Sequence, residues 1–193
     1  SGGIDSTFLL KVAITIKNSQ IIAVTVNTPL CFTQEIENAK KWAEELQANH
    51  HILKIENLLE NEILASNPPD RCYHCKKEIF SHIMEFAKKH KVKYVLDGSN
   101  YDDLKDYRPG SKAICELGIK SPLQEAKLTK EEIRILSKKF GLSSWNKPAQ
   151  TCLATRFPYQ TPLTAEGLLQ VEKAEHFLHE LGFEMLRVRH HQD

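Results

Sequence analysis

Ser1-Gly2-Gly3-Ile4-Asp5-Ser6 opens the chain and runs directly into a segment with helical periodicity. Two adjacent glycines before a helix allow positive φ angles and a close approach of the backbone to a ligand. The N-terminus of the following helix offers free N–H groups and the positive end of a dipole, which together suit a phosphate. The segment lacks the Gly-Lys-Ser/Thr ending of a Walker loop, and its glycines alone are more typical of an ordinary capped turn.

Helices and strands alternate along the chain after this loop. Apolar spacing predicts helices at 6–17, 33–46, 75–90, 129–140 and 164–181, and short apolar runs predict strands at 21–26, 51–55 and 93–96. Thr129 and Glu132 have the spacing of a capping box at the start of the fourth helix. Because such alternation requires crossovers between parallel strands, we predict an α/β fold with a doubly wound, Rossmann-like parallel sheet.

The length of 193 residues suits one domain plus the start of another. Residues 142–163 are rich in proline and lack a clear period, so we expect a boundary or a functional loop there. We therefore expect an α/β domain over 1–146 and the start of a smaller C-terminal domain over 147–193. The chain begins on a loop, so we also expect a strand before Ser1 and a further segment after Asp193.

Composition excludes several classes of function. Lys and Arg number 26 against 25 Asp and Glu, a balance of +1 that argues against nucleic-acid binding. No apolar run approaches the roughly 18 residues of a membrane helix, and the sequence does not open on a signal peptide, so we expect a cytoplasmic protein without a membrane partner. An odd count of 5 cysteines favours reduced thiols with catalytic or metal-binding roles over disulfides.

Three cysteines stand in informative settings. Cys72 and Cys75 form a Cys-x-x-Cys pair at the start of a predicted helix, where metal binding and plain packing are equally plausible. Cys152 lies in the aperiodic stretch near Arg156, a cation that could stabilise a thiolate or an anionic substrate, so Cys152 is a candidate nucleophile. Cys31 and Cys115 have no such setting, and we interpret both as structural.

Two arginines near the C-terminus form a further pattern. Met185–Val188 resembles a strand, in which Arg187 and Arg189 would point to the same face. Paired guanidinium groups suit a phosphate or a carboxylate, although a solvated edge strand is an equally good interpretation of the pattern alone.

Together these strings resemble one family. Residues 1–6 match the pyrophosphate loop of the N-type ATP pyrophosphatases, which cleave ATP between the α- and β-phosphates. The whole chain resembles the LarE family of ATP-dependent sulfur transferases, which build the nickel-pincer nucleotide cofactor of lactate racemase. The matching strings are residues 1–6, 70–76, 97–100, 102–110, 121–123, 141–142, 147–148, 152–159 and 187–190.

The resemblance implies a mechanism. ATP, with Mg²⁺, would adenylate a carboxylate of pyridinium-3,5-biscarboxylic acid mononucleotide, and Cys152 would displace AMP to form a thioester that leads to a thiocarboxylate. Arg156 would assist Cys152, and Arg187 and Arg189 would hold the mononucleotide phosphate. The ATP-binding residues implied are Ser1, Gly2, Gly3, Asp5, Ser6, Gly98 and Asn100.

Family knowledge offers two sources of sulfur. In some members the active cysteine gives up its own sulfur; in others, three cysteines hold a 4Fe–4S cluster that delivers sulfide. Cys72, Cys75 and Cys152 match the three-cysteine pattern, so the resemblance implies a metal site at these residues and a reusable enzyme. It also implies a homo-oligomer. Gln160 stands where the family has glycine, which puts the geometry of the adjacent loop in doubt.

Other functions remain compatible with the same loop. A tRNA thiolase of this superfamily would need a basic surface and usually shows two Cys-x-x-Cys pairs, whereas this chain has one. An amide-forming synthetase of the NAD or GMP type would need no cysteine trio. A module that binds ATP without cleaving it would release no pyrophosphate.

Overall fold

The computed structural model describes residues 1–191. Its main helices are α1 (Ile4–Ala13), α2 (Thr33–Glu45), α4 (Arg71–Lys89), α5 (Pro109–Glu116), α7 (Lys130–Lys139) and α8 (Ala165–Glu180). Shorter helices and turns are η1 (Glu56–Glu60), α3 (Glu62–Ala65), η2 (Asp102–Lys105), α6 (Pro122–Glu125), η3 (Ser143–Asn146) and η4 (Leu153–Arg156). No described helix is long and apolar enough to cross a membrane.

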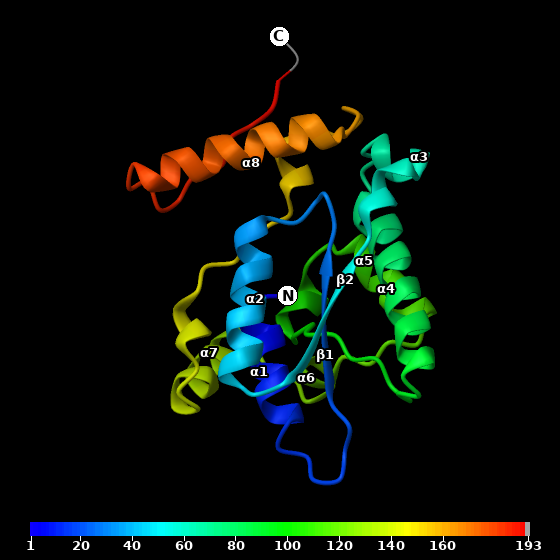
Figure 1. The fold of residues 1–193 in the computed structure, drawn as a ribbon, viewed down its shortest axis with the longest axis vertical. Helices are drawn as coiled ribbons and strands as arrows, with labels where there is room; N and C mark the ends of the chain where they lie inside the picture. Colours follow the sequence, from blue (N-terminus) through cyan, green and yellow to red (C-terminus); the bar gives the residue numbers. More distant parts are fainter. Residues whose placement is uncertain (192–193) are drawn as a thin grey trace.

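Strands β1 (Ile22–Asn27) and β2 (Asn49–Lys54) form a parallel pair in register from Ile22 opposite Asn49 to Asn27 opposite Lys54. Helix α2 is the crossover between them, and in Figure 1 the two strands run between α2 and α4. Parallel strands need such a connection because the end of one strand and the start of the next lie at opposite edges of the sheet. The predicted alternation of strand and crossover helix is confirmed here.

The predicted strand at 93–96 is wrong in this structure. That segment has a single parallel bridge, Leu96 to Lys120, and a cavity of about 600 Å³ separates it from β1. Among residues 1–191 no backbone pairs with this run along its length, and a run without a partner forms no ladder. We call this space the central cavity. The run at 185–188 is likewise extended without being a strand.

Two clusters of buried side chains build the core. One lies under α1 and α7 and contains Ile4, Phe8, Leu123, Ile133 and Leu142. The other joins the loop after β1 and the segment after β2 to η4 and α8, through residues such as Leu30, Leu58, Leu153 and Leu168. Helix α8 lies across one end of the strands (Figure 1), and its packing carries η4 and Cys152 into the same core.

Helix α7 begins as its sequence predicts. The Thr129 side chain accepts a hydrogen bond from the Glu132 amide, and Glu132 in turn accepts one from the Thr129 amide at 2.8 Å, which completes a capping box. Helix α4 begins at Arg71, one turn earlier than predicted. Cys72 and Cys75 therefore both belong to α4, three residues apart and on one face.

Candidate active site

The glycine loop is held tightly between two helices. Gly3 is the N-cap of α1, and the hydroxyls of Ser1 and Ser6 lie 2.8 Å apart across the loop. A Cβ atom on Gly2 would come within 2.9 Å of the Glu35 carbonyl oxygen on α2. Glycine at this position lets the loop pack against α2 and leaves the start of α1 open toward the central cavity, which Ser1 and Ser6 line.

The segment 97–100 meets this loop. A Cβ atom on Gly98 would lie 3.0 Å from the Ser6 nitrogen, so the Gly98 backbone rests directly on the first turn of α1. Asn100, expected to bind ATP, is instead only 3% exposed, and its side-chain oxygen accepts hydrogen bonds from the amides of Asp102 and Asp103. Asn100 therefore shapes the turn beside the loop and does not line the cavity.

The two carboxylate oxygens of Asp5 differ in their contacts. Its Oδ2 lies 2.6 Å from Lys130 Nζ, whereas its Oδ1 is buried without a hydrogen-bond partner among the described residues. A buried carboxylate oxygen with no partner is costly unless something binds it. Carboxylate oxygen is the ligand type that Mg²⁺ prefers, so Asp5 Oδ1 fits a magnesium ion held between the protein and a phosphate.

Cys152 lies beside Cys31. The Leu153 amide donates a 3.0 Å hydrogen bond to the Leu30 carbonyl. This bond joins the Cys152–Leu153 peptide group to the Leu30–Cys31 peptide group. Both cysteines line the central cavity. Cys152 also packs against the same buried cluster as Cys75 from α4. Cys31, which we interpreted as structural from the sequence, therefore lies next to the candidate nucleophile.

Burial raises the pKa of two thiols of this site, Cys75 and Cys152. Burial, together with the nearby thiols of Cys152, Cys72 and Cys31, raises the pKa of Cys75 to about 12. Burial also raises the pKa of Cys152, while the Arg71 guanidinium and the backbone amides of Ala154 and Thr155 act in the opposite direction. Desolvation is the largest effect, so a ligand that changes the surroundings of Cys152 would change its reactivity.

Arg71 is the cation beside the thiols. It is 3% exposed, donates hydrogen bonds to the Asn67 side chain and to the Ala154 carbonyl, and lies against the Tyr159 ring. Its Ala154 contact ties the first turn of α4 to the Cys152 loop. Sequence reasoning assigned this electrostatic role to Arg156, because Arg156 is closer to Cys152 in the chain.

Arg156 forms a buried ion pair with Glu175 on α8. Its guanidinium is 2% exposed and makes two hydrogen bonds, of 2.7 and 2.8 Å, to the buried carboxylate of Glu175 on α8. It also donates to the Thr151 and Thr155 hydroxyls. These contacts join the guanidinium to the Cys152 loop and to α8, and the catalytic role expected of Arg156 stays a prediction.

The Arg187–Arg189 segment is held by the same pair. Glu175 Oε1 accepts a hydrogen bond from the Val188 amide at 2.9 Å, and the His190 amide donates to the Arg156 carbonyl. Val188 and His190 are half-buried, whereas Arg187 and Arg189 are exposed. The segment is not a strand, and the predicted common face of the two arginines stays a prediction.

Comparison with known proteins shows the family to which the chain belongs. A family model described as asparagine synthase matches residues 1–104. The chain is 41% identical over 194 residues to the pyridinium-3,5-bisthiocarboxylic acid mononucleotide synthase of Lactiplantibacillus plantarum, covering 100% of this chain and 70% of that protein. This chain belongs to that synthase family, the LarE family. It is thus an ATP-dependent sulfur transferase of the pyrophosphate-loop type.

Other relatives extend the family and define the fold. An uncharacterized protein of Synechocystis sp. is 40% identical over 193 residues, covering all of this chain and 72% of its own length. Among solved structures, the NH3-dependent NAD synthetase from Campylobacter jejuni superposes with a TM-score of 0.58 at 20% identity over 94% of this chain and 75% of its own. The NMN synthetase from Francisella tularensis gives 0.59 at 16% identity, over 96% and 76%. These two show a shared α/β fold.

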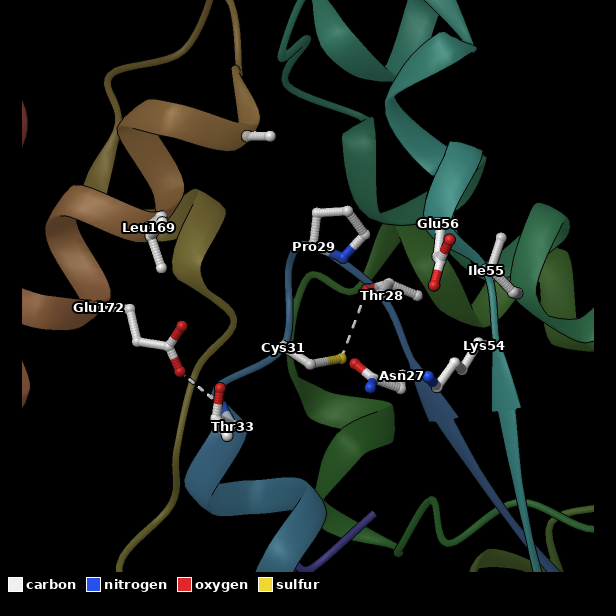
Figure 2. A pocket seen from close by; sticks show the side chains of 11 residues that line it. Asn27, Thr28, Pro29, Cys31, Thr33, Lys54, Ile55, Glu56, Leu169 and Glu172 are labelled. Carbon is white, nitrogen blue, oxygen red and sulfur yellow. Dashed lines mark hydrogen bonds between the residues drawn. The ribbon is translucent and has the colours of Figure 1, made fainter.

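Cys31 connects two cavities of this LarE-family chain. It lines the central cavity and also a pocket of about 340 Å³ where β1 and β2 end, next to α8. Figure 2 shows this pocket, with the Glu172 carboxylate accepting a hydrogen bond from the Thr33 amide at the start of α2. Because the carboxyl ends of parallel strands are the usual place for ligands, the pocket lies at the functional edge of the sheet.

The three cysteines expected to hold a cluster share one neighbourhood. Cys72 and Cys75 lie on α4, and the pKa of Cys75 responds to both Cys72 and Cys152. Three thiols are a suitable donor set for a 4Fe–4S cluster with one open iron. Within residues 1–191, however, no three His, Cys, Asp or Glu side chains stand close enough to hold a single metal ion. Side-chain rotation and loss of the thiol protons would have to accompany binding.

Proposed function

We propose that this chain adenylates a carboxylate of pyridinium-3,5-biscarboxylic acid mononucleotide with ATP and converts it to a thiocarboxylate through Cys152. The name of the Lactiplantibacillus plantarum relative supports the product. One observation carries the proposal for this chain: Ser1 and Ser6 of the glycine loop line the same cavity as Cys152. A phosphate bound at the loop and a thiol that captures the activated carboxylate would thus belong to one site.

The reaction requires both the phosphate-binding loop and the Cys152 thiol. A carboxylate has no good leaving group, so its oxygen first attacks the α-phosphorus of ATP and the bond to pyrophosphate breaks. The amides of the loop and the α1 N-terminus would bind the phosphates. Mg²⁺ bound at Asp5 Oδ1 would supply further charge compensation.

Cys152 would then attack the acyl carbon of the acyl-adenylate. The carbon–sulfur bond forms, the bond to AMP breaks, and the thiol proton is lost. Arg71 and the amides of Ala154 and Thr155 favour the thiolate against the cost of burial. Arg187 and Arg189, both exposed beside the anchored Val188, are proposed to bind the mononucleotide phosphate.

The sulfur source forms the finer part of the proposal. We propose that Cys72, Cys75 and Cys152 would hold a 4Fe–4S cluster, which would supply sulfide when bound. Attack of sulfide on the acyl carbon would break the bond to the Cys152 sulfur, so that the thiocarboxylate leaves and Cys152 survives turnover as a thiolate. Protein prepared without oxygen and reconstituted with iron and sulfide should contain about four iron atoms per chain and show cluster absorbance. Cys72→Ser should lose both signals, whereas Cys115→Ser should keep them. Absence of iron from the wild type would contradict the cluster.

The adenylation step is tested by pyrophosphate release. ATP and Mg²⁺ are supplied with the dicarboxylate mononucleotide, with bulk tRNA, or alone. We expect stoichiometric pyrophosphate and AMP with the mononucleotide, and none with the other two. Cys152→Ser should still release pyrophosphate but form no thiocarboxylate. Pyrophosphate release with tRNA alone would indicate a tRNA thiolase and overturn the proposal.

A further inference from the structure

One cation stands on the wall of the central cavity. Of the described residues that line it, Lys76 is the only lysine or arginine, and its side chain is 36% exposed. His50 also lines the cavity, but burial lowers its pKa, so that it is neutral at physiological pH. Any triphosphate that enters this cavity from the glycine loop therefore meets Lys76 as its cationic side chain on the wall.

Neighbouring residues hold Lys76 next to the loop. Its Nζ lies 3.9 Å from Asp97 Oδ2. The two Asp97 oxygens accept hydrogen bonds from the hydroxyls of Ser99, at 2.6 Å, and Ser121, at 2.5 Å. The residue after Asp97 is Gly98, whose backbone rests on the first turn of α1. The Lys76 ammonium group thus lies beside the segment that contacts the phosphate loop.

Space for the Lys76 side chain depends on a glycine. A Cβ atom on Gly110, in the first turn of α5, would lie 2.8 Å from Lys76 Cδ and 3.2 Å from the Cys72 carbonyl oxygen. Glycine at position 110 therefore lets α5 pack closely against α4 and against the Lys76 side chain. This packing orients Lys76 toward the cavity, although the side chain is long and intrinsically mobile.

Other cations near the site are already paired. Lys130 Nζ binds Asp5 at 2.6 Å, and Lys147 Nζ binds Glu35 at 2.7 Å and the Gly2 carbonyl at 2.9 Å. The guanidinium of Arg71 is hydrogen-bonded to Asn67 and Ala154. By comparison, the contact of Lys76 with Asp97 is long, and a phosphate oxygen could replace it at little cost.

We infer that Lys76 is a catalytic residue of the adenylation step, and that its ammonium group binds an α-phosphate oxygen of ATP. As the substrate carboxylate attacks the α-phosphorus and the bond to pyrophosphate breaks, Lys76 stabilises the charge on that phosphate. It then faces the phosphate of the AMP that Cys152 displaces. Lys76 lies one residue after Cys75 on α4, and Cys75 packs against the same buried cluster as Cys152. This inference rests on the function proposed above.

The test compares two adjacent lysines of α4. Lys77 is exposed, contacts the Tyr73 hydroxyl at 3.2 Å and the Glu116 carboxylate at 3.7 Å, and does not line the cavity. We expect Lys76→Gln to lower kcat for pyrophosphate release by about 100-fold. Lys76→Arg should recover part of this loss because the charge returns, and Lys77→Gln should match the wild type.

The outcomes distinguish a failure of the proposed function from a failure of the Lys76 inference. If the wild type releases no pyrophosphate, the proposed function fails. If the wild type is active and Lys76→Gln matches it, only the Lys76 inference fails. A second measurement needs no variant: ATP and Mg²⁺ should protect Lys76, and not Lys77, from acetylation of the wild-type protein. Equal labelling of Lys76 with and without ATP would overturn the inference even if Lys76→Gln failed to fold.

Discussion

The Leu153 amide donates a hydrogen bond to the Leu30 carbonyl at 3.0 Å, across a sequence separation of more than a hundred residues. This single bond sets the Cys152 loop against the segment that follows β1 and places Cys152 beside Cys31. The loop that carries the proposed nucleophile is therefore fixed to the carboxyl end of the parallel strands, where the glycine loop also opens.

A short bifunctional thiol reagent should link Cys31 to Cys152. One peptide hydrogen bond separates their backbones, a separation compatible with the range over which cysteine pairs can be bridged. Peptide mapping after treatment with such a reagent should identify this pair, and Cys31→Ser should abolish it. Cys115, which is exposed on α5, should carry only single modifications. A map without the Cys31–Cys152 link would disprove their adjacency.

Removing one partner of the Arg156–Glu175 pair should destabilise the fold. Both side chains are almost fully buried, and each loses its counter-charge when the other is replaced. We expect Glu175→Ala to lower the free energy of unfolding by about 3–5 kcal/mol in denaturant titrations. Glu172→Ala, on the same helix but at the pocket edge, should lower the free energy of unfolding much less. Equal effects of the two variants would contradict the importance of the buried pair.

Gln160→Gly should stabilise the protein. Gln160 has a φ of 66°, a left-handed conformation that costs a residue with a Cβ atom more than it costs glycine. We expect a gain of up to about 1 kcal/mol in unfolding free energy. Gln170→Gly is the matched control, because that residue lies inside α8, where glycine is unfavourable by about 1 kcal/mol. The same sign of change for both variants would argue against strain at Gln160.

The high pKa of Cys75 should make stability depend on alkaline pH. The folded protein keeps this thiol protonated to about pH 12, whereas the unfolded chain ionises it near its ordinary value of 9.0. The stabilising contribution is therefore complete below pH 9 and is lost as the pH rises toward 12. We expect wild-type unfolding free energy to fall more steeply over this range than that of Cys75→Ala, by up to about 4 kcal/mol. Parallel curves would contradict burial of this thiol.

Local patterns predicted much of the architecture. The glycine loop before α1, the buried strand at β1 and the capping box of α7 depend on neighbouring residues, so the sequence alone reveals them. The segment at 93–96 has the composition of a strand, but among residues 1–191 no backbone pairs with it along its length, and pairing is a property of the whole fold. Expected features beyond the described residues, such as a strand before Ser1, stay predictions, as do the domain boundary at 146 and the homo-oligomer.

The candidate site depended on long-range contacts in the same way. Sequence proximity favoured Arg156 as the partner of Cys152, but a buried carboxylate 19 residues later binds that guanidinium. Arg71 and Cys31 reach the site from other elements. The string around Cys72 and Cys75 did contain Arg71 and Lys76, and a count of cations against nearby carboxylates could have singled them out. No local pattern distinguishes Cys31 from Cys115.

The most direct test of the account asks whether ATP chemistry and Cys152 meet on one molecule. Protein prepared without oxygen is mixed with ATP, Mg²⁺ and the dicarboxylate mononucleotide, quenched in acid and mapped by peptide mass spectrometry. Within the first turnover the account predicts ATP-dependent acylation of Cys152 by the mononucleotide, with one pyrophosphate released per adduct, and no adduct in Cys152→Ser. Pyrophosphate release without any modification of Cys152, or an adduct on another cysteine, would contradict the account.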